Sequence, residues 1–347
     1  MICIAWGGMP AYAAAAAGQF VVSTEKPVCL VATSGDVPKT SGNRIAGSDV
    51  HWVTDNDSRS LKEVLGELPM VLVVSGWFIP SFNRFVDEVN AAGGKAIALC
   101  DNRYNFSPRQ ILWVLYFRLM IAPRFAGYMV PGRSGFQLLR FAGIPAAQIR
   151  MGMYTADPAV FHDGLPLHVR SKRMIFVGRF DERKNVLLLL RAFIAFTHRH
   201  SDWTLDCYGQ GPLQGEMESL VRATGSKAVN LHPFAQPDEL SECYRQARVM
   251  ILPSLEDHWG VVVHEAALSG CALVLSTHVG AAADFINGVG CSLFPPKSEK
   301  RLGECLDRIA GWDDDQWLTA QKSSLAAAAL ISPAKFSEHL SSLIKGL

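Results

Sequence analysis

Short apolar runs alternate with longer amphipathic stretches along the whole chain, and this alternation limits the fold more than any other feature. The apolar runs have the length of strands, whereas 185–198 repeats its apolar residues with the period of a helix. Strand–helix alternation is typical of α/β domains with parallel sheets. We expect strands at 1–5, 27–33, 70–74, 95–99 and 127–131, and at 174–178, 204–209, 228–232, 248–252, 272–276 and 290–294.

The alternation restarts after 152–173, a stretch without clear periodicity that contains Asp157-Pro158 and Gly164. A chain of 347 residues is long enough for two domains. We therefore expect an N-terminal Rossmann-like domain over 1–165 and a second one over 166–330. The remaining segment, 331–347, is predicted as a final helix that can return to the N-terminal domain.

Composition excludes several other classes of protein. The formal net charge is +1, which argues against a broad nucleic-acid-binding surface. Eight cysteines are scattered without a Cys-x-x-Cys pair, as in a cytosolic protein with reduced thiols, and we expect no structural metal and no cofactor. The apolar N-terminus contains an early glycine turn and fits a first strand and helix better than a signal peptide. No apolar run is long enough for a transmembrane helix.

Charged residues follow the predicted strand 174–178. Arg179 and Lys184 lie between this strand and the next predicted helix. Open α/β sheets bind ligands beyond the carboxyl ends of their strands, and two cations beside a helix N-terminus suit a diphosphate. An ordinary solvated loop would show the same residues.

Two carboxylates follow the predicted strand 248–252. Asp257 lies in a loop, and Glu265 lies eight residues later, inside a helix that begins near Gly260. Carboxylates accept hydrogen bonds from the vicinal hydroxyls of a sugar or ribose, and the amides of Gly260 and Val261 at the helix start suit a phosphate. A capped surface helix is the alternative.

Glycine turns stand at the ends of further predicted strands. Glycine lets backbone amides approach a ligand closely, although plain turns use the same residue. The turns are Gly7-Gly8, Gly209-Gln210-Gly211 and Gly280, the last of which precedes Asp284.

Taken in order, these segments of 174–295 resemble the C-terminal domain of glycosyltransferase family 4, a retaining group among the group 1 glycosyl transferases. The resemblance is carried by G-R-x4-K-N at 178–185, G-x-G-P at 209–212, acid-x7-Glu at 257–265 and G-x3-acid at 280–284. It implies the GT-B fold, with two Rossmann-like domains whose parallel sheets face each other across a cleft. The first half resembles the family only in its general pattern and its Gly7-Gly8 turn.

The resemblance also implies roles for the charged residues. Arg179 and Lys184 would bind the donor diphosphate and stabilise the leaving charge, Asp257 would face the transferred sugar, and Glu265 would hold the ribose hydroxyls. The family usually has Glu at the first acidic position, so Glu256, one residue before Asp257, is the alternative there.

Backbone amides are implied to approach the donor or acceptor at Gly7, Gly8, Gly209, Gly211, Gly260 and Val261. In many family members a histidine near the end of a middle N-terminal strand lies close to the sugar. This chain has Asp101-Asn102 in the comparable stretch, and either residue could serve instead.

The implied function is that of a metal-independent, hexosyltransferase-type enzyme. It would move a sugar from a nucleotide-diphosphate donor, which is a co-substrate, to a glycan or lipid-linked acceptor with retention of configuration, in polysaccharide or glycolipid assembly. Epimerisation or phosphorolysis on the same fold is one alternative. A catalytically silent nucleotide-sugar-binding or scaffold protein is the other, and Asp257 and the absent histidine keep it open.

The segment 108–127 mixes arginines with aromatic and aliphatic residues. Such a helix packs on a sheet with its charges in water, which we prefer, or lies on an anionic membrane. In the second case the cytosolic protein would sit on the inner face of the membrane, and its acceptor would be lipid-linked.

Overall fold

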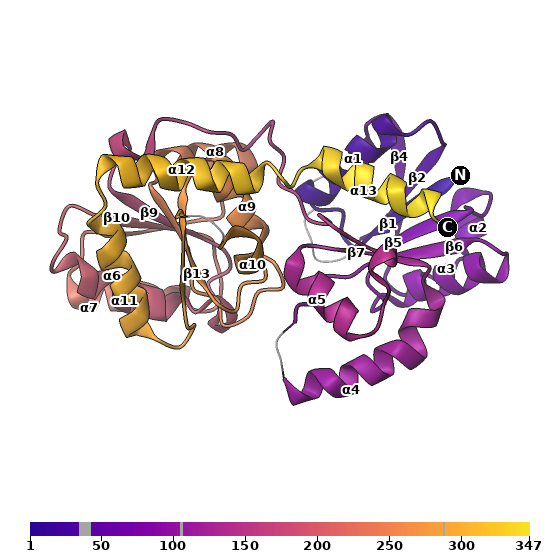
Figure 1. Ribbon diagram of the computed structural model, residues 1–347, viewed down its shortest axis with the longest axis horizontal. Helices are drawn as coiled ribbons and strands as arrows, with labels where there is room; N and C mark the ends of the chain where they lie inside the picture. The colour runs from indigo at the N-terminus through magenta and orange to yellow at the C-terminus, as the bar shows by residue number, and fades with distance from the viewer. Residues whose placement is uncertain (35–42, 105–106, 287–288) are drawn as a thin grey trace. The chain divides into compact units, whose positions relative to one another are not determined.

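The computed structural model describes residues 1–34, 43–104, 107–286 and 289–347, and the chain divides into two compact units. Unit 1 contains Met1–Thr155 and Ile331–Leu347, and unit 2 runs without interruption from Ala156 to Leu330. Each is an α/β unit built on its own sheet (Figure 1). Every strand that the sequence predicts is present, with ends that differ by no more than one residue.

The sheet of unit 1 has the strand order β3-β4-β2-β1-β5-β6-β7-β8. Its strands pair in parallel, except that β3 is antiparallel to β4. The chain builds outward from β1 and then returns to β5 on the other side, so the order reverses between β1 and β5. The bounds are β1 Ile2–Trp6, β2 Val28–Thr33, β3 Arg44–Ile45, β4 Ser48–Val53, β5 Val71–Ser75, β6 Lys95–Leu99, β7 Gly127–Val130 and β8 Ile149–Met151.

Helices cover both faces of this sheet, because successive residues of a strand point to opposite sides. Cys3 and Ala5 of β1 belong to one core, which α2 (Leu61–Leu65), α3 (Pro80–Ala91) and α5 (Arg133–Phe141) help to fill. Ile2, Ile4 and Trp6 belong to the other, beneath α1 (Ala11–Ser23) and α13 (Pro333–Lys345). The last helix therefore completes a core that the first residues of the chain begin.

The sheet of unit 2 is parallel throughout, with the order β11-β10-β9-β12-β13-β14. Here the order reverses between β9 and β12. The strand bounds are β9 Arg173–Val177, β10 Thr204–Tyr208, β11 Val229–His232, β12 Val249–Leu252, β13 Ala272–Ser276 and β14 Cys291–Phe294.

The helices of unit 2 form two layers, one on each face of its sheet (Figure 1). One layer consists of α6 (Val186–Thr197), α7 (Gln214–Thr224) and α11 (Glu299–Ala310). The other consists of α8 (Pro237–Gln246), α9 (Val261–Leu268), the short α10 (Ala282–Phe285) and α12 (Asp314–Ala328).

The division between the units falls after Thr155, ten residues before the expected boundary at 165/166. The intervening segment packs on unit 2. Ser241 on α8 donates a hydrogen bond to the carbonyl of Val160 at 2.6 Å, and the ring of Phe161 lies edge-on to that of Tyr244. These contacts are formed with residues far along the chain, which is why local sequence pattern did not show them.

Among the residues that the structure describes, no helix combines the length and apolar character needed to cross a bilayer.

Candidate functional site

The candidate site lies at the carboxyl edge of the sheet of unit 2, where the strand order reverses. Loop 178–185 follows β9 and loop 253–260 follows β12, and these two strands are neighbours. In open parallel sheets this position is the usual place for a ligand, because the two connections leave in opposite directions. Both loops carry residues that the sequence singled out.

Lys184 and Asp257 meet at this point. The Lys184 ammonium lies 2.5 Å from a carboxylate oxygen of Asp257, and the two side chains are only 12% and 13% exposed. Glu256, the alternative at this position, is exposed. Lys184 and Asp257, which were expected to bind different parts of a donor, thus pair with each other in the free protein.

Arg179 lies on the same loop in a more open setting. Its side chain is 71% exposed and pairs with Asp181, whose second carboxylate oxygen accepts the backbone amide of Lys184 at 3.0 Å. Asp181 thus holds the loop and orients Arg179, a role that sequence reasoning missed although the acid stands between the two cations. An exposed ion pair is weak, so Arg179 is free to exchange Asp181 for another anion.

Asn185 joins the two loops. It adopts a left-handed conformation (φ 57°), which asparagine tolerates better than most residues, just before α6. Its side-chain amide donates to the carbonyls of Pro253 and Pro296 at 3.2 and 2.7 Å. The amide of Leu255 donates to the carbonyl of Arg183 at 2.8 Å. Hydrogen bonds within unit 2 therefore fix the loops that carry Lys184 and Asp257 relative to each other.

The segment after β13 supports the Asp257 loop from the other side. Asp257 donates its amide to His278, and the amide of Gly280 donates back to the carbonyl of Asp257 at 3.0 Å. A Cβ at Gly280 would lie 1.9 Å from the carbonyl oxygen of His258, so only glycine fits. The indole of Trp259 donates to Asp284 at 3.2 Å. The predicted G-x3-acid turn is thus a support for the site.

Helix α9 begins directly after this loop. Gly260 adopts a left-handed conformation (φ 93°) and has no side chain that could cap the helix, and the first turn of α9 contains no acid. The first amides of a helix have no acceptor within the helix, and its dipole makes this end partly positive. The amides at Gly260 and Val261 therefore lie at a helix start that could attract an anion, directly after the loop that carries Asp257, the partner of Lys184.

Glu265 lies further along α9. The hydroxyl of Tyr244, on α8, donates to its carboxylate at 3.3 Å. Burial raises the pKa of Glu265 to about 7, and the hydrogen bond from Tyr244 lowers it only in part. Tyr244 lies 21 residues before Glu265, and no sequence signal links the two.

His264 holds α9 in place. Its Nδ1 accepts the amide of Ala156 at 2.9 Å, and its Nε2 lies 3.1 Å from the carbonyl of Ala328. An acceptor role for Nδ1 leaves the proton on Nε2, which then donates to Ala328. This histidine thus ties α9 to segments near both ends of unit 2.

The other predicted glycines make contacts within their own units. A Cβ added at Gly209 would lie 2.0 Å from the carbonyl oxygen of Gly178. A Cβ added at Gly211 would lie 2.4 Å from the carbonyl oxygen of Phe180. In unit 1, the amide of Gly7 donates to Ser75 at 2.7 Å and that of Gly8 to Thr33 at 3.2 Å. Close packing within unit 2 accounts for Gly209 and Gly211 without a ligand, and the amides of Gly7 and Gly8 are hydrogen-bonded within unit 1.

Asp101, suggested in place of the family's histidine, lies just beyond β6 in unit 1. It accepts a hydrogen bond at 3.1 Å from the hydroxyl of Tyr154, whose ring packs edge-on against that of Tyr12. Burial raises the pKa of Tyr154 well above its ordinary value.

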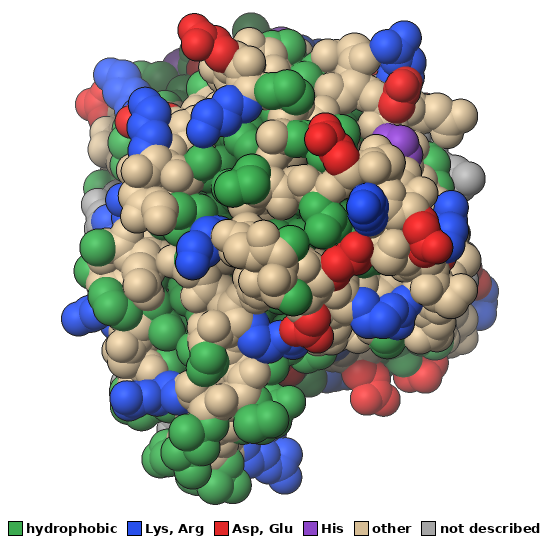
Figure 2. Space-filling model, turned by 90° about the vertical axis from the view of Figure 1, so that its right-hand side faces the viewer, with side chains coloured by type: hydrophobic (Ala, Val, Ile, Leu, Met, Phe, Trp, Pro, Cys, Tyr) green, Lys and Arg blue, Asp and Glu red, His purple; other side chains and the backbone are tan. Residues whose placement is uncertain are grey.

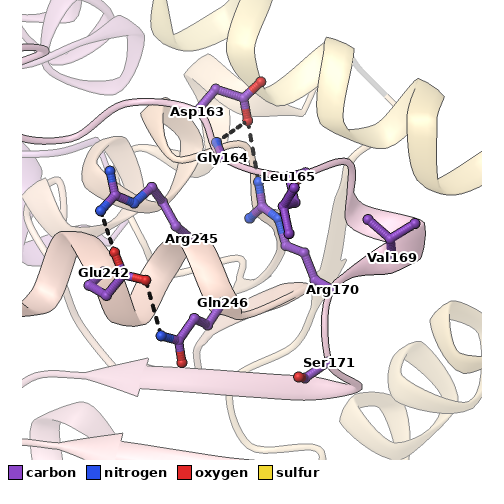
Figure 3. Close-up of a pocket in the computed structure, with 9 residues that line it drawn as sticks. All are labelled: Asp163, Gly164, Leu165, Val169, Arg170, Ser171, Glu242, Arg245 and Gln246. Carbon is purple, nitrogen blue, oxygen red and sulfur yellow. Dashed lines mark hydrogen bonds and ion pairs between the residues drawn. The ribbon is translucent and has the colours of Figure 1, made fainter.

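Cavities lie on opposite edges of the sheet of unit 2. A cavity of about 270 Å³ at the carboxyl edge is lined by Phe180, Gly209, Gln210, Gln214, Glu218, Leu231, His232 and Pro233. A larger one of about 540 Å³ lies near the start of β9, at the amino edge (Figure 3). There Arg170 donates to Asp163 and to four backbone carbonyls, while Glu242 pairs with Arg245. Because these polar groups are already hydrogen-bonded or ion-paired within the protein, they indicate a structural role for the residues that line this cavity.

The two units together have the GT-B fold. Over the full length of both chains, the structure superposes on HepE of Anabaena in complex with UDP, with a TM-score of 0.79 at 12% identity. Sucrose-phosphate synthase of Thermosynechococcus elongatus gives a TM-score of 0.75 at 16% identity, with 100% of this chain and 99% of that one covered. At such identities the likeness establishes the fold alone.

Sequence comparison points to a more specific group for unit 2. Residues 171–311 match the family model described as glycosyl transferases group 1. An uncharacterised glycosyltransferase of Methanocaldococcus jannaschii is 29% identical over 49% of this chain and 43% of its own length. A D-inositol 3-phosphate glycosyltransferase of Corynebacterium kroppenstedtii is 27% identical over 52% and 41%. The chain thus spans about two fifths of the length of these curated relatives.

Proposed function

We propose that this chain is a retaining glycosyltransferase that moves a hexose from a nucleotide-diphosphate sugar to a glycan or lipid-linked acceptor without a metal, in polysaccharide or glycolipid assembly. The observation that carries the proposal is the Lys184–Asp257 pair, held at the strand-order reversal of unit 2 beside the uncapped start of α9. The match of residues 171–311 to group 1 glycosyl transferases supports it.

The proposed reaction breaks the bond between the sugar C1 and the diphosphate oxygen and forms a bond from C1 to an acceptor hydroxyl oxygen. The hydroxyl proton passes to the departing diphosphate. Lys184 exchanges Asp257 for the diphosphate, and Asp257 then accepts hydrogen bonds from sugar hydroxyls. Arg179 and the amides at Gly260 and Val261 stabilise the charge that develops on the leaving group.

The nucleoside would occupy the rest of the carboxyl edge. Glu265 accepts hydrogen bonds from the ribose hydroxyls, as two vicinal hydroxyls suit one carboxylate. The cavity beside Gly209 has polar groups, among them Gln210, Gln214 and His232, that can distinguish one base from another. Gly7, Gly8 and Asp101 of unit 1 are proposed for the acceptor side.

The decisive experiment is a donor screen followed by turnover. Melting temperatures are measured with UDP, GDP, ADP and their sugars, since a ligand at about 100 times its Kd adds roughly 2.7 kcal/mol of stability. Transfer is then assayed with a glycan and lipid panel that includes D-inositol 3-phosphate, because several relatives are named D-inositol 3-phosphate glycosyltransferases.

Lys184→Ala should remain folded and lower kcat by about 10²–10³, and Arg179→Ala should act in the same direction. Lys172→Ala is the matched control, because Lys172 also pairs with an aspartate, Asp202, at 2.5 Å but precedes β9. Near-normal turnover by Lys184→Ala would reject the mechanism. Donor binding without turnover on any acceptor would favour the alternative, a silent nucleotide-sugar-binding or scaffold protein.

A further inference from the structure

One helical stretch of unit 1 leaves much of its surface unpacked. It begins with α4 (Pro108–Tyr116) and continues through a π-helical turn, η1 (Phe117–Ile121), into a short 3-10 turn, η2 (Ala122–Arg124). Its inner side packs on an aromatic cluster, where Trp113 and Phe117 stack at 4.9 Å between ring centroids and contact Trp77. None of the residues of α4 is buried.

The outer side of this stretch forms what we call the apolar ridge. Six large apolar side chains there are between 55% and 72% exposed: Ile111, Leu112, Leu115, Tyr116, Leu119 and Met120. The preferred sequence interpretation, a helix packed on the sheet with its charges in water, accounts for the inner side only.

The spacing of the ridge keeps its members on one side. They occur in adjacent pairs that recur every four residues, at 111–112, 115–116 and 119–120. On a helix of 3.6 residues per turn, a four-residue repeat drifts around the axis. The π turn at Phe117–Ile121 has more residues per turn and offsets that drift. The apolar side chains therefore stay aligned along the outer surface.

The charged residues of the segment that contains the ridge have one sign. Residues 102–156 contain seven arginines and no aspartate, glutamate or lysine, although the whole chain has a net charge of +1. Arg109 and Arg118 are exposed on the helical stretch itself, and Arg133 and Arg140 on α5 are exposed as well. Figure 2 shows the lowest lobe of the molecule, where Figure 1 places α4, covered by apolar side chains with basic groups beside them.

We propose that the apolar ridge docks unit 1 on an anionic lipid bilayer. An amphipathic helix lies in the interface with its apolar side among the acyl chains, and flanking arginines reach the lipid phosphates. Two copies of the ridge facing each other would bring the same arginines together, so the charge favours an anionic partner over a second copy of this chain. Docking does not depend on the transfer reaction and stands or falls separately from it.

The test is co-sedimentation of the full-length protein with vesicles. We expect binding to phosphatidylcholine vesicles that contain about one third phosphatidylglycerol, and a loss of most of it when salt rises from about 0.1 M to about 1 M. The double variant Leu112→Asp/Leu115→Asp should abolish binding. Arg109→Glu/Arg118→Glu should weaken it at least about tenfold on anionic vesicles. Arg124 is left unchanged, because it is bonded to Asp87 and Asn83 within unit 1.

Matched controls carry the same kinds of change elsewhere on unit 1. Val22→Asp/Met70→Asp replaces two exposed apolar residues, and Lys26→Glu/Lys62→Glu reverses two charges, and both should bind like the wild type. Melting temperatures confirm that each variant is folded. No binding of the wild type to anionic vesicles, or unchanged binding of the ridge variant, overturns the proposal. Dimers that dissociate in the ridge variant, without any vesicle binding, would overturn it in favour of self-association.

Discussion

At the scale of single residues, the candidate site contains a carboxylate that the fold holds at a cost. Burial raises the pKa of Glu265 from 4.5 to about 7, so the native state binds a proton there more tightly than the unfolded chain does. Stability from this group is fully present below pH 4.5 and is lost as pH rises through 7. Above pH 7 the ionised group destabilises the native state by up to about 3 kcal/mol.

Replacing Glu265 by glutamine should therefore stabilise the free protein at pH 8 by up to about 3 kcal/mol, or roughly 6–12 °C in melting temperature for a unit of this size. At pH 4.5 the two proteins should melt together, since Glu265 is then protonated. The same change at Glu216, exposed on α7, serves as the control. An equal shift at both pH values would show that the effect of Glu265→Gln has another cause.

The charged residues of the candidate site could be proposed from the sequence, whereas most of the residues that position them could not. Lys184 and Asp257 lie in loops that follow two neighbouring strands, and sheet topology brings these loops to one edge, while Glu265 lies in the helix that follows the second loop. Tyr244 and His264 act through contacts made from neighbouring helices, and such contacts leave no local pattern. The left-handed conformation of Asn185 could have been predicted, because asparagine tolerates this conformation and here directly precedes an apolar helix.

At the scale of elements, buried apolar strands could be predicted from the sequence, whereas short or polar strands could not. The predicted strands were easy to find because they are buried and apolar on both faces. The strands β3, β4 and β8 were missed, since β4 carries aspartate, histidine and serine, and β3 and β8 are very short. The β3–β4 hairpin turns through Ala46 and Gly47, both with positive φ, and alanine there disguises the usual turn signal.

Gly211→Ala tests the close packing of the loop after β10. Its new Cβ would lie 2.4 Å from the carbonyl oxygen of Phe180, so the loop must shift, at a cost of about 1–3 kcal/mol. Gly215→Ala is the matched control, because no atom of the described residues lies within 4 Å of a Cβ there and alanine favours the helix α7. Denaturant titration of both variants measures the difference. A neutral Gly211→Ala would mean that the turn yields without cost.

At the scale of the whole molecule, the two units differ in continuity. Unit 2 is one uninterrupted segment, whereas unit 1 needs α13 from the far end of the chain. Phe336, Leu340 and Leu343 of that helix are buried with Phe20 of α1 and with β1. The predicted final helix is therefore part of the core of unit 1.

Removal of those side chains should weaken unit 1 selectively. We expect Phe336→Ala to cost about 3–5 kcal/mol and Leu340→Ala about 2–5 kcal/mol. Limited proteolysis followed by mass spectrometry should then show cuts within 1–155 while 156–330 stays intact. Leu347→Ala, at an exposed position, should change nothing. Equal sensitivity of both units would contradict this division of the core.

The late arrival of α13 also sets an order of events on the ribosome. β1 and α1 leave the exit tunnel before α13, so the apolar groove that they form stays open until α13 has been translated. The continuous domain in the middle meets no such delay and can mature while synthesis proceeds. Unit 1 thus begins before unit 2 and closes after it, and it is the unit that nascent-chain chaperones would need to shield.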